Sequence, residues 1–473
     1  MSSPQTTTSS PARLQGRLGT GSIVFMVIAA AAPLTVVGGN VPLAVAGGNG
    51  VGAPAGFVLA AAVLLVFSVG FVTLTPHVRE AGAFFSYVTA GLGSRAGLGT
   101  AFTALVAYTA IQVGVYGYAG WAVDDLVQHF GGPELPWWLY SSALLAVVAL
   151  LGYRHIELSA RVLGVALVAE IAVVVLLDLV VLGRGGRDGL VMESFAPANV
   201  LSPQLGVAVL FALTGFIGFE ATAVFRDEAR DLERTIPRAT YLAVLVIGVF
   251  YAVSCWALIT AVGAADAVAV AERTLAGEGN LLLDTTEDYL GPVLRDVVQV
   301  LLVTSLFACV LSFHNVLARY QFTLAGKGVL PRGLAQRHER HAAPSTASLV
   351  QTVTAAVVLA VLALLGLDPL VGVFGSMAGV ATVGMVLLML TTSIAVLVFF
   401  ARHPGASSRG RASTVLAPVL AVSGLLACLW LVLSNFPLVT GGTVLVSTLL
   451  ALVPAVAFAA GVLAGGRFRL ADD

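Results

Sequence analysis

The stretch FALTGFIGFEATAVFRDEARDLERTIPRA, Phe211 to Ala239, decides the fold of this chain. It places Glu220 inside an apolar helix interrupted by glycines, and it then ends that helix in a dense run of charge. A carboxylate near the centre of a bilayer costs about 2.5 to 3.5 kcal/mol on insertion scales, so such a group is seldom incidental. The stretch therefore predicts a broken membrane helix with a buried acid beside the break.

The rest of the chain has the composition of an integral membrane protein. Of its 473 residues, 58% are hydrophobic and 10% are charged, with a mean hydropathy of +0.97, whereas soluble domains carry about 25% charged residues. Apolar stretches of about 20 residues, long enough to cross a bilayer, recur from Ser22 to Gly465. We therefore predict an all-α protein embedded in the lipid bilayer, with about twelve membrane helices and no soluble domain.

The spacing of the apolar stretches predicts the organisation of the chain. Residues 1–20 form a disordered cytoplasmic tail, residues 21–182 and 202–400 form two five-helix sets, and residues 465–473 form a second cytoplasmic tail. Helices eleven and twelve lie within residues 414–464. Thr235, which precedes Ile236 and Pro237, is the predicted N-cap of helix seven.

Charge is sorted along the chain by side of the membrane. About 20 of the 24 basic residues fall in segments that share the side of both termini, which by the positive-inside rule is the cytoplasm. The four on the other side are Arg184, Arg187, Arg273 and Arg295. Because the charges are not clustered for phosphate, no nucleic-acid partner is predicted. The arginine-rich and alanine-rich composition is typical of a GC-rich bacterial genome, so we expect a multi-pass protein of a bacterial plasma (inner) membrane.

Two helices carry breaks at corresponding places in the two five-helix sets. Helix one reads AAAAPLTVVGGNVPLAVAGG from Ala29 to Gly48, and helix six reads LTGFIGFE from Leu213 to Glu220. Paired interruptions of this kind indicate the central site of an inverted-repeat transporter, because unwound backbone can bind a ligand directly. The alternative is that Pro33 only kinks its helix and that the glycines only allow close helix packing.

These residues resemble the amino acid-polyamine-organocation (APC) superfamily of permeases over nearly the whole chain. GFIGFE with the following DEA and IPRA is similar to the helix-six signature of that superfamily. EAGAFFSYVTAGLG (Glu80 to Gly93) and HNVLARYQFTLAGKGVLP (His314 to Pro331) are similar to its motifs after helix two and at the end of helix eight. The resemblance implies the five-plus-five inverted repeat of the leucine-transporter (LeuT) fold, with helices one and six broken, plus two C-terminal helices.

The resemblance also implies where a substrate binds. Positions matched to those that hold the carboxylate or the amino group of the substrate, or that line its side-chain pocket, are Ala31, Leu34, Thr35, Phe216, Ile217, Phe219, Gln112 and Phe313. The first break departs from the family pattern, because Pro33-Leu34-Thr35 replaces a glycine-serine-glycine type of turn and Pro33 has no N–H to donate.

Three titratable residues are candidates for proton coupling or gating. Glu170 in helix five aligns with a position that is lysine in many proton-coupled relatives, and a carboxylate there can also gain and lose a proton. Glu220 directly follows the second break, and His314 lies within helix eight. The alternative for each is a structural role, with Ser305, Ser312 or His314 as hydrogen-bond partners of Glu170. Asp178 is expected only to reach the membrane interface.

The sequence therefore predicts a secondary active transporter that imports an amino acid or a small organic amine with a proton by alternating access. It contains no nucleotide-binding loop and no catalytic cluster such as HExxH, so we predict neither a cofactor nor an enzymatic activity. An exchanger of amino acids or amines, sodium coupling, and a channel or transporter-like sensor stay as alternatives. Substrate identity, direction, stoichiometry and oligomeric state are not indicated.

Overall fold

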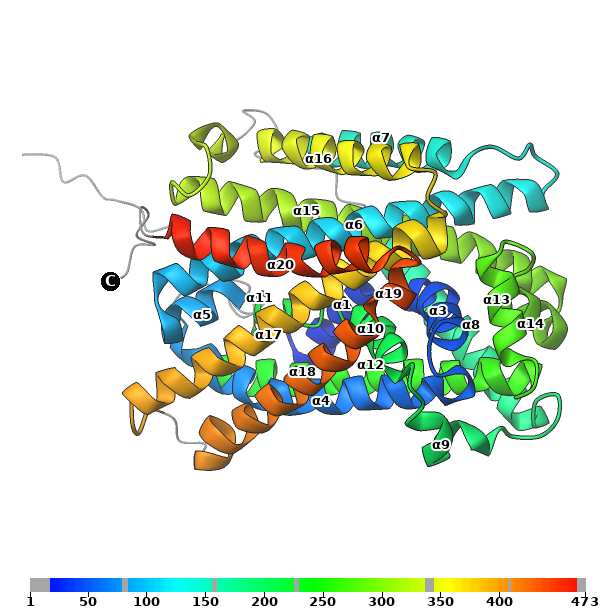
Figure 1. Cartoon of the computed structure of the whole chain (residues 1–473), viewed down its shortest axis with the longest axis horizontal. Coiled ribbons are helices and arrows are strands. Elements are labelled where there is room, and N and C mark those ends of the chain that lie inside the picture. Colours follow the sequence, from blue (N-terminus) through cyan, green and yellow to red (C-terminus); the bar gives the residue numbers. More distant parts are fainter. Residues whose placement is uncertain are drawn as a thin grey trace, which may run out of the picture.

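The computed structural model of the protein describes residues 18–78, 84–154, 160–224, 229–336, 344–406 and 410–465. Within these ranges ten helices are long and apolar enough to cross a membrane, and two shorter apolar helices, Trp137–Tyr153 and Leu205–Gly215, accompany them. The long helices run side by side along the horizontal axis of Figure 1. The prediction of an all-α membrane protein with about twelve membrane helices is confirmed.

The membrane helices follow one another in the predicted order. The first five positions hold α1 (Thr20–Ala31) with α2 (Pro33–Thr35), η1 (Val36–Asn40) and α3 (Val41–Ala46), then α4 (Ala53–Leu74), α6 (Ser94–His129), α7 (Trp137–Arg154) and α8 (Ala160–Arg184). The next five hold α10 (Leu205–Gly215) with α11 (Ala221–Val224), then α12 (Leu232–Val262), α15 (Pro292–Gly326), α16 (Ser345–Leu364), and η7 (Pro369–Gly375) with α17 (Ser376–Arg402). The last two hold η8 (Ala412–Leu416) with α18 (Ala417–Ser434), and α20 (Val444–Ala464).

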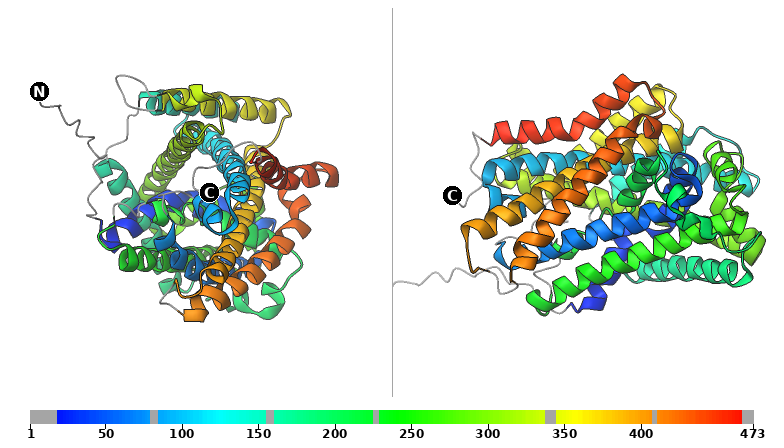
Figure 2. Two further views of the ribbon diagram at one scale, coloured as in Figure 1. Left: turned by 90° about the vertical axis from the view of Figure 1, so that its left-hand side faces the viewer. Right: turned by 60° about the horizontal axis from the view of Figure 1, so that its bottom comes forward.

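Short helices connect the long ones. They are η2 (Gly50–Gly52), η3 (Thr75–His77), α5 (Phe84–Leu92), η4 (Met192–Phe195), α9 (Pro197–Val200), α13 (Ala267–Leu275), α14 (Leu281–Leu290), η6 (Arg332–Ala335) and α19 (Phe436–Thr440). The pair α13 and α14 lies at the right-hand end of the molecule in Figure 1, and α5 lies at the opposite end. The long helix α6 packs against α15, α17 and α20, so it forms the centre of the bundle (Figure 2).

The first helix is broken at Ala32, as the sequence predicts. Ala32 adopts a left-handed backbone conformation (φ 47°, ψ 74°), which ends α1 at Ala31. Pro33 has no N–H to continue the helical hydrogen bonding, so the chain restarts at α2. The π-helical segment η1 follows and contains Gly38 and Gly39, against which the ring of Tyr118 packs. The break therefore exposes backbone groups that need partners from other helices.

The sixth membrane helix is broken between Gly215 and Ala221. α10 ends at Gly215, and residues 216–220 form successive turns before α11 begins. Gly218 has φ 112°, a backbone conformation that side chains rarely adopt. A Cβ atom at Gly218 would lie 3.3 Å from the Cβ atom of Ala30, so the two breaks are in close approach. Both predicted breaks are confirmed, and they lie next to each other.

The start of helix seven differs from the prediction. The helix begins at Leu232, and its N-cap is Asp231, whose Oδ1 accepts hydrogen bonds from the N–H groups of Glu233 (3.0 Å) and Arg234 (3.2 Å). Thr235 lies inside the helix, and the prediction that it is the N-cap is therefore wrong. Pro237 lies near the helix start and removes a single backbone hydrogen bond, so the helix tolerates it. Asp231 stabilises the same end of the helix by accepting hydrogen bonds from two backbone N–H groups.

We predict that Gly218→Ala lowers the free energy of unfolding by about 1–3 kcal/mol, because alanine at this backbone conformation is strained. Thermal unfolding of the purified protein in detergent measures the change. Gly183→Ala is the matched control, since a Cβ atom at Gly183 in α8 would meet no other atom within 4 Å and the φ of this residue is not positive. Equal unfolding temperatures for the two variants would contradict the prediction.

Candidate functional site

Glu170 links three membrane helices at the first break. Its side chain is buried, and its Oε2 accepts a hydrogen bond of 2.9 Å from the Ser305 hydroxyl of α15. Its carboxyl group also accepts the backbone N–H of Leu34, which belongs to α2 directly after the break. The predicted partner Ser305 is thus confirmed, whereas Ser312 is exposed. Glu170 on α8 therefore holds the unwound backbone of helix one against helix eight.

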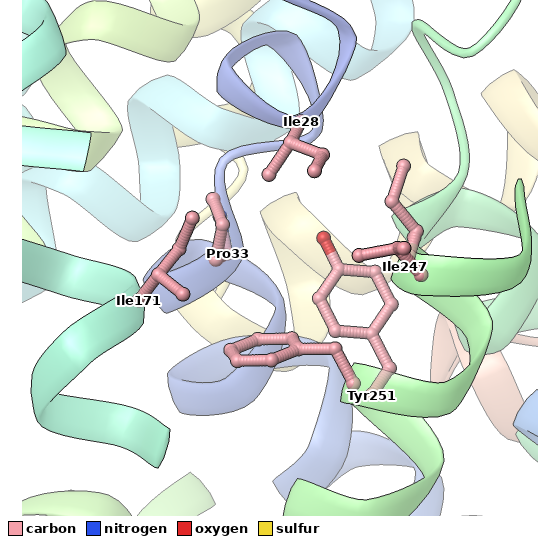
Figure 3. A pocket seen from close by; sticks show the side chains of 7 residues that line it. Ile28, Pro33, Ile171, Ile247 and Tyr251 are labelled. Carbon is pink, nitrogen blue, oxygen red and sulfur yellow. The ribbon is translucent and has the colours of Figure 1, made fainter. Parts of the chain in front are cut away.

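Tyr251 of α12 binds the backbone on the α1 side of the first break. Its hydroxyl donates a hydrogen bond of 3.0 Å to the carbonyl oxygen of Ala31, the last residue of α1. Figure 3 shows this hydroxyl directed toward the chain between Ile28 and Pro33. Beside it lies a cavity of about 40 Å³ lined by Ile28, Pro33, Ile171, Val246, Ile247, Phe250 and Tyr251. One backbone acceptor and one backbone donor of the break are therefore satisfied by side chains.

Glu220 binds an unwound backbone group at the second break, as Glu170 does at the first. Its Oε2 accepts a hydrogen bond of 2.9 Å from the N–H of Gly218, and its Oε1 accepts one of 2.5 Å from the Tyr108 hydroxyl of α6. The carboxyl group is buried and has no ion-pair partner among the described residues. The same holds for Glu170. The described hydrogen-bond donors to both acids are therefore neutral groups.

The apolar residues predicted to line the substrate pocket lie around these acids. The rings of Phe216 and Tyr251 are 6.2 Å apart, and those of Phe313 and Tyr108 are 6.1 Å apart. Phe219 packs at 6.0 Å against Phe67 of α4. Together with the buried Ile217, these side chains place apolar surface beside the two breaks. Phe216 contacts Tyr251, which is hydrogen-bonded to the first break. Phe313 contacts Tyr108, which is hydrogen-bonded to Glu220.

Ala31, Leu34 and Thr35 all lie at the first break, as predicted, and all are buried. The hydroxyl of Thr35 has no hydrogen-bond partner among the described residues. A buried hydroxyl without a partner is costly unless a ligand or a water satisfies it. Thr35 is therefore the side chain of this segment best suited to contact a substrate or a coupling ion.

Gln112 belongs to a chain of amide hydrogen bonds between α6, α15 and α16. Its Oε1 accepts a hydrogen bond of 2.8 Å from Gln351, whose own Oε1 accepts one of 2.8 Å from Gln321. Its Nε2 lies 3.5 Å from the carbonyl oxygen of Val310. The amide group of Gln112 is thus engaged by other helices, and no hydrogen bond joins it to either break among the described residues. A cavity of about 430 Å³ beside Gln321 and Gln351 likewise contains no break residue in its lining.

His314 is separate from both acids. Its Nε2 lies 2.8 Å from the Ser348 hydroxyl of α16, and its ring packs against Gly152 of α7. The buried imidazole therefore faces α7 and α16, whereas Phe313, its neighbour in α15, faces Tyr108. The structure does not bring His314 together with Glu170 or Glu220.

Asp178 differs from its prediction. Instead of reaching the membrane interface, it is 7% exposed and accepts a hydrogen bond of 2.7 Å from the Ser254 hydroxyl of α12. Its other carboxylate oxygen is buried and has no partner in the described part of the chain. The expectation was wrong because the rotation of α8, which points Asp178 toward α12, is not visible in an apolar sequence.

Sequence reasoning missed Tyr108 and Tyr251, the two hydroxyl donors that hold the breaks. A tyrosine within an apolar helix needs a partner for its hydroxyl, which was the signal available for both residues. Several other tyrosines lie in membrane helices, however, and the sequence does not show which of them face a break. Tyr118, for example, is fully buried, yet its hydroxyl has no partner among the described residues.

The family of this chain is shown by its sequence. The chain matches the amino acid permease family over residues 18–460. A low-affinity putrescine importer of Escherichia coli is 25% identical over 206 residues, which cover 42% of this chain and 44% of that protein. An uncharacterised transporter of Mycobacterium tuberculosis is 27% identical over 343 residues, which cover 70% of this chain and 68% of that protein. The chain thus aligns with less than half the length of the putrescine importer.

A solved structure shares the fold. The transporter MhsT in complex with L-phenylalanine superposes with a TM-score of 0.63 at 13% identity, covering 89% of this chain and all of that chain. The all-helical bundle with two adjacent broken helices therefore has the LeuT fold. The family match over residues 18–460 gives the class, a membrane permease. Within that class, the chain belongs to the amino acid permease family of the APC superfamily.

We predict that Tyr108→Phe lowers the free energy of unfolding by about 1.5–3 kcal/mol, because it leaves a buried oxygen of Glu220 without its donor. Tyr118→Phe is the control, since it removes a buried hydroxyl that has no partner among the described residues and should change stability little. Thermal unfolding in detergent compares the two variants. The prediction fails if Tyr118→Phe destabilises the protein as much as Tyr108→Phe does.

Proposed function

We propose that this permease imports an amino acid or a small organic amine together with a proton, by alternating access around the two broken helices. The observation that carries the proposal is the position of Glu170, which joins α8, α15 and the unwound backbone after Ala32. A group at this junction can couple its own protonation to the conformation of the break. An exchanger that swaps one amine or amino acid for another is the main alternative.

The coupling follows from the hydrogen-bonding capacity of a carboxyl group. Ionised Glu170 accepts hydrogen bonds only, which suits the Ser305 hydroxyl and the Leu34 N–H. Protonated Glu170 gains an O–H donor and releases part of that acceptor capacity. Protonation therefore weakens its hold on the Leu34 N–H and frees the break to change conformation, whereas loss of the proton restores the hold. Sodium is a weaker candidate because the observed contacts are donors, and a cation would require acceptors.

Glu220 and Tyr108 are proposed as the gate between the substrate and the side of the termini. Their hydrogen bond crosses from α6 to the turn that contains Gly218, so it must break if these two segments separate. In this proposal the proline and glycine breaks leave backbone groups without helical partners. Glu170 and Glu220 bind those backbone groups until a substrate or a proton replaces the contact.

Proposed recognition of the substrate rests on the same segments. Backbone at residues 31–35 and 216–219, with the hydroxyl of Thr35, would hold its polar groups, and Phe216, Phe219 and Phe313 would contact its apolar part. MhsT holds L-phenylalanine, and the E. coli relative is a putrescine importer. Both ligands carry an amine, and we propose an amine-bearing solute here, either an amino acid or a small organic amine.

We predict that Glu170→Gln abolishes stimulation of uptake by an inward proton gradient but retains exchange of labelled substrate. Glutamine keeps the size and an acceptor oxygen for Ser305, but it cannot exchange a proton. Uptake of labelled amino acids and amines into proteoliposomes, with and without the gradient, measures both activities. Glu193→Gln is the control, because Glu193 is an exposed carboxylate of η4.

Two other outcomes would change the mechanism. Exchange that is independent of the gradient in the wild type, and unchanged in Glu170→Gln, would identify an exchanger and give Glu170 a structural role. Binding of substrate without uptake or counterflow would instead identify a sensor.

The proposed orientation, with both termini in the cytoplasm, predicts which positions an impermeant maleimide can label. The native cysteines Cys255, Cys309 and Cys428 are buried, so only a cysteine introduced at the surface should react with the maleimide. We expect Glu193→Cys to react in intact cells and Arg332→Cys to react only after the membrane is permeabilised. The reverse pattern would invert the topology.

A further inference from the structure

Helix α8 carries a second buried acid on the same side as Glu170. Asp178 follows Glu170 by eight residues, which is about two helical turns and about 12 Å along the axis. The opposite side of α8 is exposed, with Val168 and Leu179 more than half accessible, as expected for contact with lipid. Both acids therefore face the interior of the bundle, and Asp178 lies nearer the end of α8 that is opposite the termini.

The surroundings of Asp178 are those of a proton acceptor without a fixed counter-ion. Its Oδ2 accepts a hydrogen bond from Ser254, while its Oδ1 is buried without a partner among the described residues. Arg184, six residues further along α8, lies over the ring of Tyr289 at 5.9 Å instead. A buried, unpaired carboxylate is costly inside a membrane, whereas its protonated form supplies a donor and carries no charge.

Most of the other titratable groups on the helices packed against α8 have partners of their own. On α14, the Asp284 carboxylate accepts the Asn280 N–H, Glu287 pairs with Arg295, and the Tyr289 hydroxyl donates to the Ala261 carbonyl. Asp288 lies beside Tyr289. α15 carries Arg295, Asp296, Cys309, His314, Arg319 and Tyr320, and α12 carries Glu233, Arg234, Arg238, Tyr241, Tyr251 and Cys255. Of these, Cys309, His314, Tyr320, Tyr251 and Cys255 are buried. None of these groups forms a described ion pair with Asp178.

Two hydroxyl groups of α12 lie in the surroundings of the two acids. Ser254 and Tyr251 are one turn apart on α12, so they lie on one face of that helix. Ser254 donates to Asp178, and Tyr251 donates to the Ala31 carbonyl at the break that Glu170 holds through Leu34. The remaining side chains of this interface, such as Val174, Leu177 and Ile247, are apolar and buried. Each acid thus has one α12 hydroxyl in its surroundings, and no hydrogen bond between these two hydroxyls is described.

We propose that Asp178 and Ser254 form a second proton-binding site, which takes up the proton from the side opposite the termini and passes it to Glu170. Because the two acids are about two helical turns apart, the transfer runs through intervening hydroxyl groups or water: the O–H bond at Asp178 breaks, each relay group accepts one proton and gives up another, and an O–H bond at Glu170 forms. Asp178 then regains its charge and its acceptor role toward Ser254. The proposal rests on the proposed proton coupling at Glu170, and it assigns to Asp178 a role in loading that site rather than in holding the substrate.

The test measures gradient-driven uptake and counterflow in proteoliposomes across a series of external pH values. Asp178→Asn should slow gradient-driven uptake by about tenfold or more, as expected when a proton-transfer partner is lost, and should abolish the dependence of its rate on external pH. Counterflow without a gradient should stay within about twofold of wild type, because substrate exchange does not need the loading step. Asp178→Glu should restore at least half of the driven uptake, and Ser254→Ala should shift the pH profile.

Ser68→Ala controls for the loss of a buried serine, since Ser68 donates only to the Leu64 carbonyl of its own helix. Driven uptake in Asp178→Asn within twofold of wild type at every pH would overturn this inference alone. Parallel loss of driven uptake and counterflow, without rescue by Asp178→Glu, would also overturn it, because that result marks a structural residue. If wild type itself shows no stimulation by the gradient, the proposed function is wrong, and this inference is overturned with it.

Discussion

Unwound backbone inside a membrane is the constraint on which the rest of this structure depends. Lipid offers no hydrogen bonds, so each N–H and C=O group released by a break must find a partner within the protein. Here the Ala31 carbonyl is satisfied by Tyr251, the Leu34 N–H by Glu170, and the Gly218 N–H by Glu220. The two buried acids are therefore needed for the fold before any transport function is considered.

The breaks are also tied to the surrounding bundle by polar contacts. The Asn40 side chain of η1 donates a hydrogen bond of 2.8 Å to the Phe211 carbonyl of α10, which joins the two broken helices. Thr214 of α10 lies 2.6 Å from the Thr382 hydroxyl of α17. These contacts lie between the breaks and the end of the molecule that carries α13 and α14, whereas the acids hold the turns themselves. The turns are therefore held by the carboxyl contacts, and the helices next to them by the asparagine and threonine contacts.

The sequence predicts the helices and their breaks well because both depend on local chemistry. Hydropathy marks the apolar stretches, and proline and glycine mark the places where a helix cannot continue, as at Pro33 and Gly218. Partners between helices depend instead on how each helix is rotated about its axis, which a uniformly apolar sequence does not encode. This explains why Glu170 and Glu220 could be singled out while Tyr108 and Tyr251 could not. It also explains why Asp178 was assigned to the interface and why Gln112 is engaged with α16. The division into repeats at residues 21–182 and 202–400 stays a prediction.

The end of the molecule that carries α13 and α14 is closed over the breaks in this structure. α13 packs against α3, and Leu282 of α14 lies beside Gly38 together with the Tyr118 hydroxyl. The Tyr118 ring further contacts Phe374 and Trp121, at 5.4 and 5.9 Å between ring centroids. Glycine at positions 38 and 39 is required for this closure, since a Cβ atom at either would collide with Tyr118. Closure at this end is thus made by Tyr118 of α6 and Leu282 of α14, which pack against the glycines of η1.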